Sequence, residues 1–184
     1  MKKMIFLAAT FAVTNVFAAI SPKTKAALSN SAILRGGGAI HGGVAGGSYT
    51  LLGVRTQASK NHKLERVTVS VGDPILQSYQ GAPGYFHIEN TPETKRVVIH
   101  FAQTLKTKFD EKALQKVFLR SSFVKKSEII YEPQSQTMSL VLEMKKNASI
   151  RATPIAGVGK QTAELKVDLF EDALLPQKNQ KRRK

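Results

Sequence analysis

The chain contains no cysteine and no tryptophan among its 184 residues. Without cysteine, no disulfide can stabilise the fold, no thiol can act as a nucleophile, and no lipid can be attached as in bacterial lipoproteins. Acidic residues are also few, because 13 Asp and Glu stand against 28 Lys and Arg, for a formal net charge of +15. Such a charge indicates an anionic partner, and it says little about the fold.

No apolar run is long enough to span a bilayer comfortably. The longest begins at Met4, follows the positive pair Lys2 and Lys3, and gives way to small residues that end at Ala18. This order is typical of a secretory signal peptide, so residues 1–18 are predicted to be cleaved, with an uncleaved anchor as the alternative. We therefore expect a periplasmic protein without a transmembrane anchor. In that compartment the expected partner is peptidoglycan or another anionic envelope polymer, and no nucleic acid is expected.

Large apolar residues are scarce between residues 19 and 48, where glycines cluster. Such a segment buries too little surface to offset its ordering entropy, and it is predicted to be a flexible leader. Its glycines do not fit the G-x-G-x-x-G spacing, and no G-K-[ST] follows, which argues against a phosphate-binding loop. Residues 173–184 end in Lys-Arg-Arg-Lys and are predicted to be a basic disordered tail.

Residues 49–172 have the two-residue period of strands that cover a core on one side. Val67, Val69 and Val71 alternate with polar residues, and the same period recurs over 96–101, 139–144 and 164–169. Shorter candidates lie at 51–54, 85–88, 127–132 and 149–153, separated by Gly, Pro and Asn turns. The segments 127–132 and 137–143 are predicted to form a hairpin.

One helix interrupts the strands. Asp110 is a plausible N-cap, and Ala113, Leu114, Val117 and Phe118 form one apolar stripe. The predicted fold class is therefore all-β: a compact β-sandwich of two antiparallel sheets with one short helix, flanked by disordered termini.

The order of these elements over 49–172 resembles the AMIN domain, a periplasmic module of cell-wall amidases and type IV pilus secretins. The resemblance rests on Leu52-Gly53-Val54-Arg55, on the strands at 65–71, 137–144 and 163–169, and on the aromatic strand 85–92 with its proline turn. Residues 96–101 are similar to the family's R-[LIV]-V-[LIV]-D-[LIVF] strand, with His100 in place of the aspartate and a longer insertion at 74–84. The resemblance implies a β-sandwich that binds peptidoglycan or localises at the envelope.

Catalytic signatures are sparse. No H-E-x-x-H occurs and the four histidines are scattered, so neither a metal nor a cofactor is expected. Ser122 and Lys125 fit S-x-x-K, but the nearest candidate for the K-T-G strand is only Lys106-Thr107-Lys108. The strand carboxylates are predicted to be solvated charges and not an acid–base pair: Glu65, Glu89, Glu128, Glu132, Glu143, Glu164 and Asp168. We therefore predict that the protein is not an enzyme.

The candidate ligand-binding residues have side chains suited to carboxylates, phosphates or sugars, because arginine offers a planar fork and tyrosine a flat ring. They are Arg66, Tyr85, His87, Arg96, His100, Arg151 and Lys166. The alternative interpretation is that basic residues are spread over every solvent-facing surface. The predicted function is a non-catalytic periplasmic module that binds peptidoglycan or the cell envelope and localises an envelope assembly. The alternative is a structural protein that binds a secretin, pilus or other envelope protein through a sheet edge.

Overall fold

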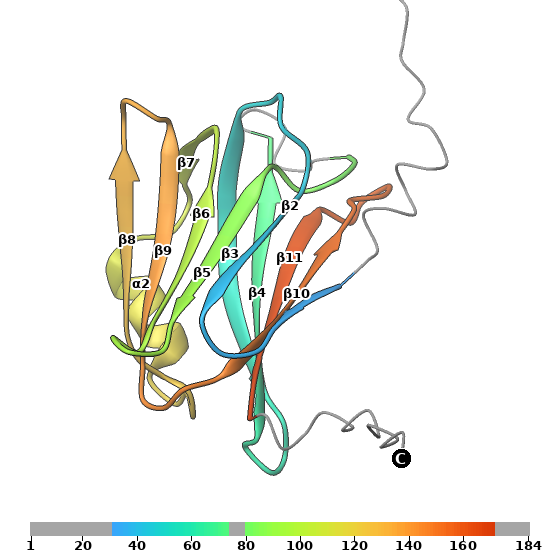
Figure 1. Cartoon of the computed structure of the whole chain (residues 1–184). Helices are drawn as coiled ribbons and strands as arrows, with labels where there is room; N and C mark the ends of the chain where they lie inside the picture. The colour runs from blue at the N-terminus through green and yellow to red at the C-terminus, as the bar shows by residue number, and fades with distance from the viewer. Residues whose placement is uncertain (1–30, 74–79, 172–184) are drawn as a thin grey trace, which may run out of the picture.

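The computed structural model describes residues 31–73 and 80–171, which form two β-sheets packed face to face with one short helix at their side (Figure 1). This confirms the predicted mainly β sandwich with one helix. The predicted signal peptide (1–18) and basic tail (173–184) lie outside the described residues, as does the start of the predicted leader (19–30).

Each sheet mixes strands from distant parts of the chain. The six-stranded sheet has the order β1 (Ala32–Leu34), β10 (Ser149–Ile155), β11 (Ala163–Phe170), β4 (Leu64–Gly72), β3 (Tyr49–Ala58) and β7 (Thr104–Thr107). The five-stranded sheet has the order β2 (Gly38–Gly42), β5 (Phe86–Thr91), β6 (Arg96–Phe101), β9 (Thr137–Met144) and β8 (Val124–Glu132). Neighbouring strands run antiparallel except β3 and β7, and the predicted hairpin is the pair β8 and β9.

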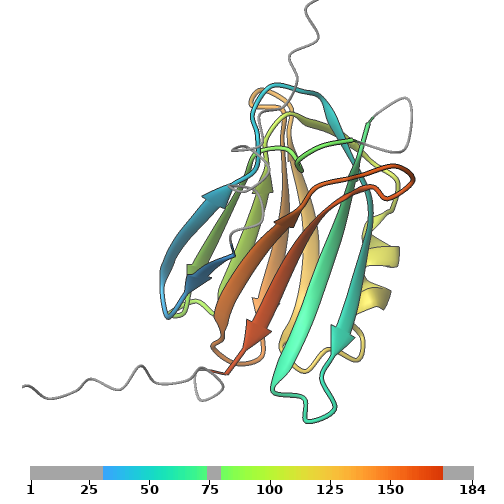
Figure 2. The ribbon, with the colours of Figure 1, turned by 90° about the vertical axis from the view of Figure 1, so that its right-hand side faces the viewer.

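Figure 2 shows the two sheets one behind the other. The core lies between them and is filled by the apolar side chains of the alternating strands. Val67 and Val69 of the six-stranded sheet and Ile88 and Ile99 of the five-stranded sheet have no exposed surface. Because each strand turns every second side chain inward, the other phase forms two outer faces. These outer faces carry the polar residues and any binding site built on strands.

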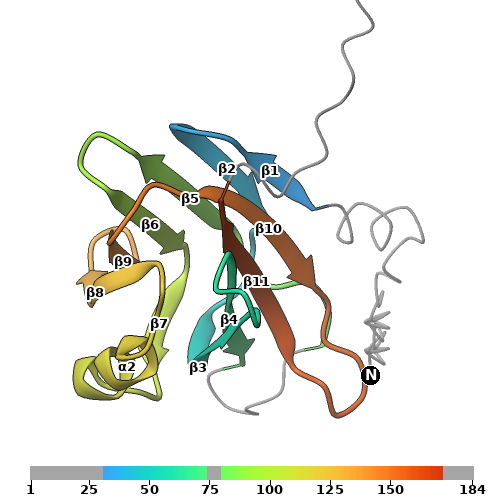
Figure 3. The ribbon, with the colours of Figure 1, turned by 90° about the horizontal axis from the view of Figure 1, so that it is seen from below.

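The helix α2 (Glu111–Phe118) closes one open side of the sandwich, between β8 and β3 (Figure 3). Its N-cap is Asp110, as predicted, whose carboxylate accepts a hydrogen bond of 2.7 Å from the backbone N–H of Ala113. Leu114 and Phe118 are buried. Within the described ranges, no helix has the length and apolar character needed to cross a membrane.

The prediction of a flexible leader is wrong from Ala32 onward, because β1 and β2 close the other side of the sandwich. β1 pairs with β10 and β2 pairs with β5, so main-chain hydrogen bonds to distant strands supply what the segment lacks in apolar area. Asn90 fastens the turn between them, since its Nδ2 donates to the carbonyl of Gly36 at 2.6 Å. These two strands belong to the domain.

Candidate binding groove

The seven predicted ligand-binding residues do not converge on one site, because they lie on opposite sheets. Arg66, Arg151 and Lys166 belong to β4, β10 and β11 of the six-stranded sheet. His87 and the pair Arg96 and His100 belong to β5 and β6 of the five-stranded sheet, and Tyr85 immediately precedes β5. Each set alternates with buried residues and therefore occupies an outer face.

On the six-stranded sheet the predicted residues are already held by neighbours. Arg66 donates two hydrogen bonds to Asp168, of 2.6 Å from Nε and 2.9 Å from Nη2. Hydrogen bonding to Asp168 raises the pKa of Arg66. Lys166 Nζ lies 3.8 Å from Glu164, and the Arg151 guanidinium lies 5.6 Å from the centre of an aromatic ring. These side chains have structural partners, which leaves them less available to a ligand.

Three carboxylates that were predicted to be solvated are buried. Glu65, Glu164 and Asp168 are 1%, 6% and 2% exposed. Glu65 lies in the inward phase of β4, where its Oε2 accepts hydrogen bonds from Ser121 Oγ (2.8 Å) and the backbone N–H of Ser122 (2.9 Å). The prediction was wrong here because strand alternation alone does not reveal a buried polar partner. The other four carboxylates lie on the outer face of the five-stranded sheet.

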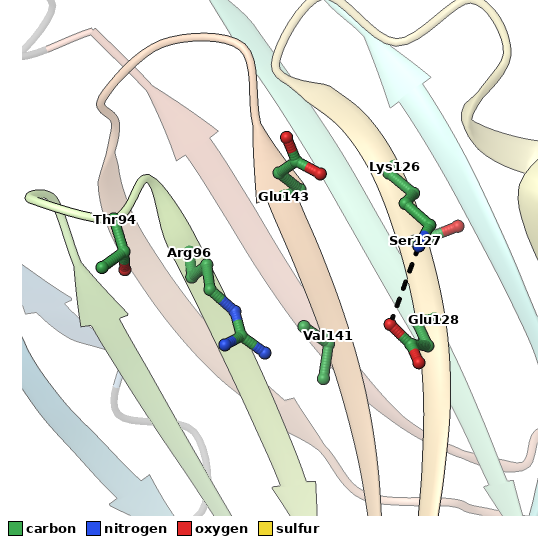
Figure 4. A pocket seen from close by; sticks show the side chains of 7 residues that line it. All are labelled: Thr94, Arg96, Lys126, Ser127, Glu128, Val141 and Glu143. Carbon is green, nitrogen blue, oxygen red and sulfur yellow. Dashed lines mark ion pairs between the residues drawn. The ribbon is translucent and has the colours of Figure 1, made fainter.

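Two adjoining hollows, of about 370 Å³ and about 260 Å³, form a groove across that outer face. Both hollows are lined by Thr94, Arg96 and Val141 (Figure 4). The hollow of about 370 Å³ is also lined by Lys126, Ser127, Glu128 and Glu143. The hollow of about 260 Å³ is also lined by Glu89, Thr91, Val98, His100, Ile130, Glu132 and Ser139. The groove is therefore shallow, polar, and long enough to cross β5, β6, β9 and β8.

Arg96 stands where the two hollows meet. Its side chain is exposed and, among the residues that the structure describes, the guanidinium forms no hydrogen bond or ion pair. Figure 4 shows its guanidinium reaching from β6 toward Val141 on β9. A free guanidinium beside an apolar surface can bind a carboxylate or phosphate through two parallel hydrogen bonds.

Glu143 and Glu128 form no ion pair with Arg96, because a lysine holds each of them, although Glu143 and Arg96 attract each other at longer range. Glu143 is opposite Arg96 in the register, but it accepts a hydrogen bond of 2.6 Å from Lys125. That bond, more than the Coulomb attraction of the same lysine, lowers the pKa of Glu143. Glu128 lies 4.0 Å from Lys126 on the same strand. The arginine is thus left as the free cation of the groove among the described residues.

Histidines border the groove on its β5 side. His100 lines it directly, with Nδ1 2.8 Å from Ser139 Oγ, and His87 Nε2 lies 2.9 Å from Glu89 Oε1. The structure adds His41, which lies opposite His87 on β2. Sequence reasoning missed His41 because it placed this residue in the leader, and no local signal gives a pairing register.

The S-x-x-K match is not assembled as that chemistry requires. Lys125 points to Glu143, and Ser122 Oγ instead lies 3.3 Å from Nδ1 of the exposed His62. In the described part of the chain, no three His, Asp or Glu side chains are grouped to hold a metal ion.

A scan against protein-family models gives no match to this chain, and a search of curated proteins gives none either. The fold and the groove define its class: a two-sheet β-sandwich with a polar groove on one outer face. Membership of the AMIN family stays a prediction from the strand pattern.

Proposed function

We propose that the protein is a non-catalytic periplasmic module that binds peptidoglycan through the groove and so localises an envelope assembly. The observation that carries the proposal is the unpaired Arg96 at the centre of a groove that crosses four strands. An arginine without an internal partner keeps its hydrogen-bonding capacity for an external anion.

The shape and charge of the groove suit an extended ligand that carries both signs. Its lining includes two cations, Arg96 and Lys126, and four carboxylates. Peptidoglycan stem peptides present carboxylates and amino groups along a strand, so Arg96 would take a carboxylate and Glu132 an amine. Val98 and Val141 supply apolar contact between them.

Two sequence features support the envelope as the location. Residues 1–18 have the pattern of a cleavable signal peptide, and residues 49–172 resemble the AMIN domain. The proposal of a non-catalytic role rests on the ion pairs of the candidate groups, because Lys125 and Asp168 are engaged in holding other side chains.

The test is co-sedimentation of the purified protein with washed peptidoglycan sacculi at about 0.15 M salt and over a salt series. Arg96→Gln removes the free cation, and Arg120→Gln makes the same change of charge beyond the end of α2, outside the groove lining. We expect Arg96→Gln to lower the affinity for sacculi by roughly tenfold or more, as for a lost charge-assisted hydrogen bond. Arg120→Gln should bind like the wild type.

A third variant ends at residue 172 and lacks the basic tail. If this variant still pellets and Arg96→Gln does not, the groove is the binding site. Equal loss in Arg96→Gln and Arg120→Gln, or loss of all binding with the tail, would show that the attraction is generic charge and would overturn the proposal.

A second candidate function is favoured by the free edge of β8. This strand is the last of its sheet, is nine residues long, and carries Ile130 and Tyr131, just before its final residue, at 38% and 42% exposure. An edge strand with exposed apolar side chains can accept a strand from another envelope protein. The first part of β8 is less open to strand addition, because it carries Lys125, Lys126 and a register irregularity.

Cross-linking in intact cells tests this candidate, with a photoreactive residue in place of Tyr131. A defined partner that disappears in an Ile130→Lys variant would support the edge as the interface. Cross-links that persist in Ile130→Lys would rule out the edge.

A further inference from the structure

Three histidines lie in one row across the outer face of the five-stranded sheet. In the register of β2, β5 and β6, His41 is opposite His87, and His87 is opposite His100. The ring centres of the first pair are 6.4 Å apart and of the second pair 5.8 Å apart. We call these three residues the histidine row.

The histidine row is continuous with the groove. His100 lines the hollow that also contains Arg96, and the row runs from there across β5 to the exposed His41 on β2. The three rings are not buried in the core, since the alternating residues Ile40, Ile88 and Ile99 are the ones that fill it. A ligand that extends from the groove past His100 along the row can therefore contact all three imidazoles.

The ionisable groups around the row lie at β5, β6 and β8. On β5 the carboxylate of Glu89 contacts His87 directly, with Oε1 2.9 Å from Nε2, and Tyr85 lies just before the strand. Arg96 is on β6, and Glu132 faces the same hollow from β8. β9 contributes the uncharged Ser139 next to His100, and β2 offers no other ionisable side chain.

The groove lining has two cations and four carboxylates when its histidine is neutral, so its net charge is negative. Imidazole is the side chain that ordinarily gains its charge between about pH 8 and pH 5. With all three histidines protonated, the groove lining and the histidine row together carry five positive charges against four carboxylates, a net positive charge. At spacings near 6 Å the imidazolium charges would also repel one another, and a bound anion would offset that repulsion.

We propose that the histidine row is a proton-dependent subsite for the carboxylates of the ligand, which strengthens binding as the pH falls below neutrality. This inference rests on the proposed function, because it extends the same groove. The sign follows from linkage: a carboxylate binds the protonated row better than the neutral row, so binding takes up protons and the affinity rises with acidity. Arg96 provides the part of the affinity that does not depend on pH in this range.

The first experiment repeats sacculus co-sedimentation at about pH 7.5, 6.5 and 5.5 at constant ionic strength. It compares the wild type with the triple variant His41→Gln, His87→Gln and His100→Gln, and with His62→Gln as the control outside the row. We expect a rise in affinity of about fivefold from neutral to acidic pH in the wild type and in the control, the size expected of a few exposed charge contacts. The triple variant should show no rise.

The second experiment does not need peptidoglycan. Imidazole proton signals of the wild-type protein are followed by NMR while glutarate, a plain dicarboxylate, is added at the acidic and the neutral pH. The signals of the row should shift at acidic pH only, and those of His62 should move least.

The outcomes separate the two proposals. Suppose that sacculus binding needs Arg96 but depends on pH in the triple variant as it does in the wild type. This result would support the proposed function and overturn the role of the histidine row. Absence of sacculus binding together with a glutarate response restricted to the row keeps the subsite and overturns peptidoglycan as the ligand. Absence of a glutarate response overturns the subsite.

Discussion

Arg66 and Asp168 face each other across β4 and β11, and both nitrogens of one edge of the guanidinium contact both oxygens of the carboxylate, at 2.6 and 2.9 Å. The aspartate side chain is 3% exposed and the arginine side chain 42% exposed. Asp168 therefore depends on Arg66 for its charge balance, while Arg66 still touches solvent. Arg66, a predicted ligand-binding residue, thus has a structural partner in the six-stranded sheet.

From this relationship we predict that Arg66→Gln destabilises the protein without weakening its binding to sacculi. The variant leaves a buried carboxylate short of two hydrogen bonds, which costs about 2–3 kcal/mol. Urea unfolding at neutral pH measures the loss, and co-sedimentation measures the binding. Unchanged stability with lost binding would assign Arg66 to a ligand site after all.

A second prediction concerns the loop between α2 and β8. Glu65 Oε2 accepts hydrogen bonds from Ser121 Oγ and from the backbone N–H of Ser122, so Glu65→Ala should cost about 2–3 kcal/mol. Ser122→Ala is the control, because that hydroxyl contacts only the exposed His62. Thermal unfolding of both variants should show a clear shift for the first and almost none for the second. Equal shifts would contradict the role given to Glu65.

A third prediction concerns pH. The hydrogen bond from Lys125 lowers the pKa of Glu143 below its ordinary 4.5, so Lys125→Met should raise it toward that value. The pKa of Glu143 is lower in the folded protein than in the unfolded chain, so the ion pair stabilises the fold at pH values above the ordinary pKa. This stabilisation is lost as the pH falls through the folded-state pKa. Carboxyl NMR titration of the two proteins measures the change. Added salt should reduce it, since both groups are exposed.

The fourth prediction tests whether residues before Tyr49 belong to the fold. Gly43 has φ +82°, and a Cβ there would lie 2.2 Å from the carbonyl oxygen of Gly84. Gly43→Ala should therefore cost about 2 kcal/mol or more. Gly46 also has a positive φ, +110°, but its Cβ would meet open space, so Gly46→Ala isolates the cost of the backbone conformation alone. If this segment were a flexible leader, neither substitution would change the free energy of unfolding. Urea unfolding measures that free energy.

The long strands and the helix could be predicted because their signals are local. Val67, Val69 and Val71 reveal an inward face without knowledge of any partner strand, and Asp110 marks the helix start by its own side chain. The strands β1, β2 and β7 could not be predicted, since they are short and are stabilised by pairing with residues far along the chain. Such pairing leaves no periodic trace in a glycine-rich segment.

The binding surface was predictable only as a set of residue types. Arg96 and His100 were identified correctly as solvent-facing strand residues, but the sequence does not say which strands share a sheet. That assignment separates Arg66 from Arg96 and brings His41 beside His87. Likewise, only the register brings Lys125 of β8 to Glu143 of β9, opposite Arg96. The groove is therefore a product of topology.

The turn at residues 35–37 joins β1, on the edge of one sheet, to β2, on the edge of the other. A mechanical pull on the N-terminal side of the domain would load β1 first. Three residue pairs hold β1 to β10, whereas five hold β2 to β5. Tension would peel away the shorter strand and release roughly 20 Å of chain, at about 3.4 Å per residue, before it reached β2. A tethered copy of this protein would thus lengthen in a small first step while its groove stayed intact.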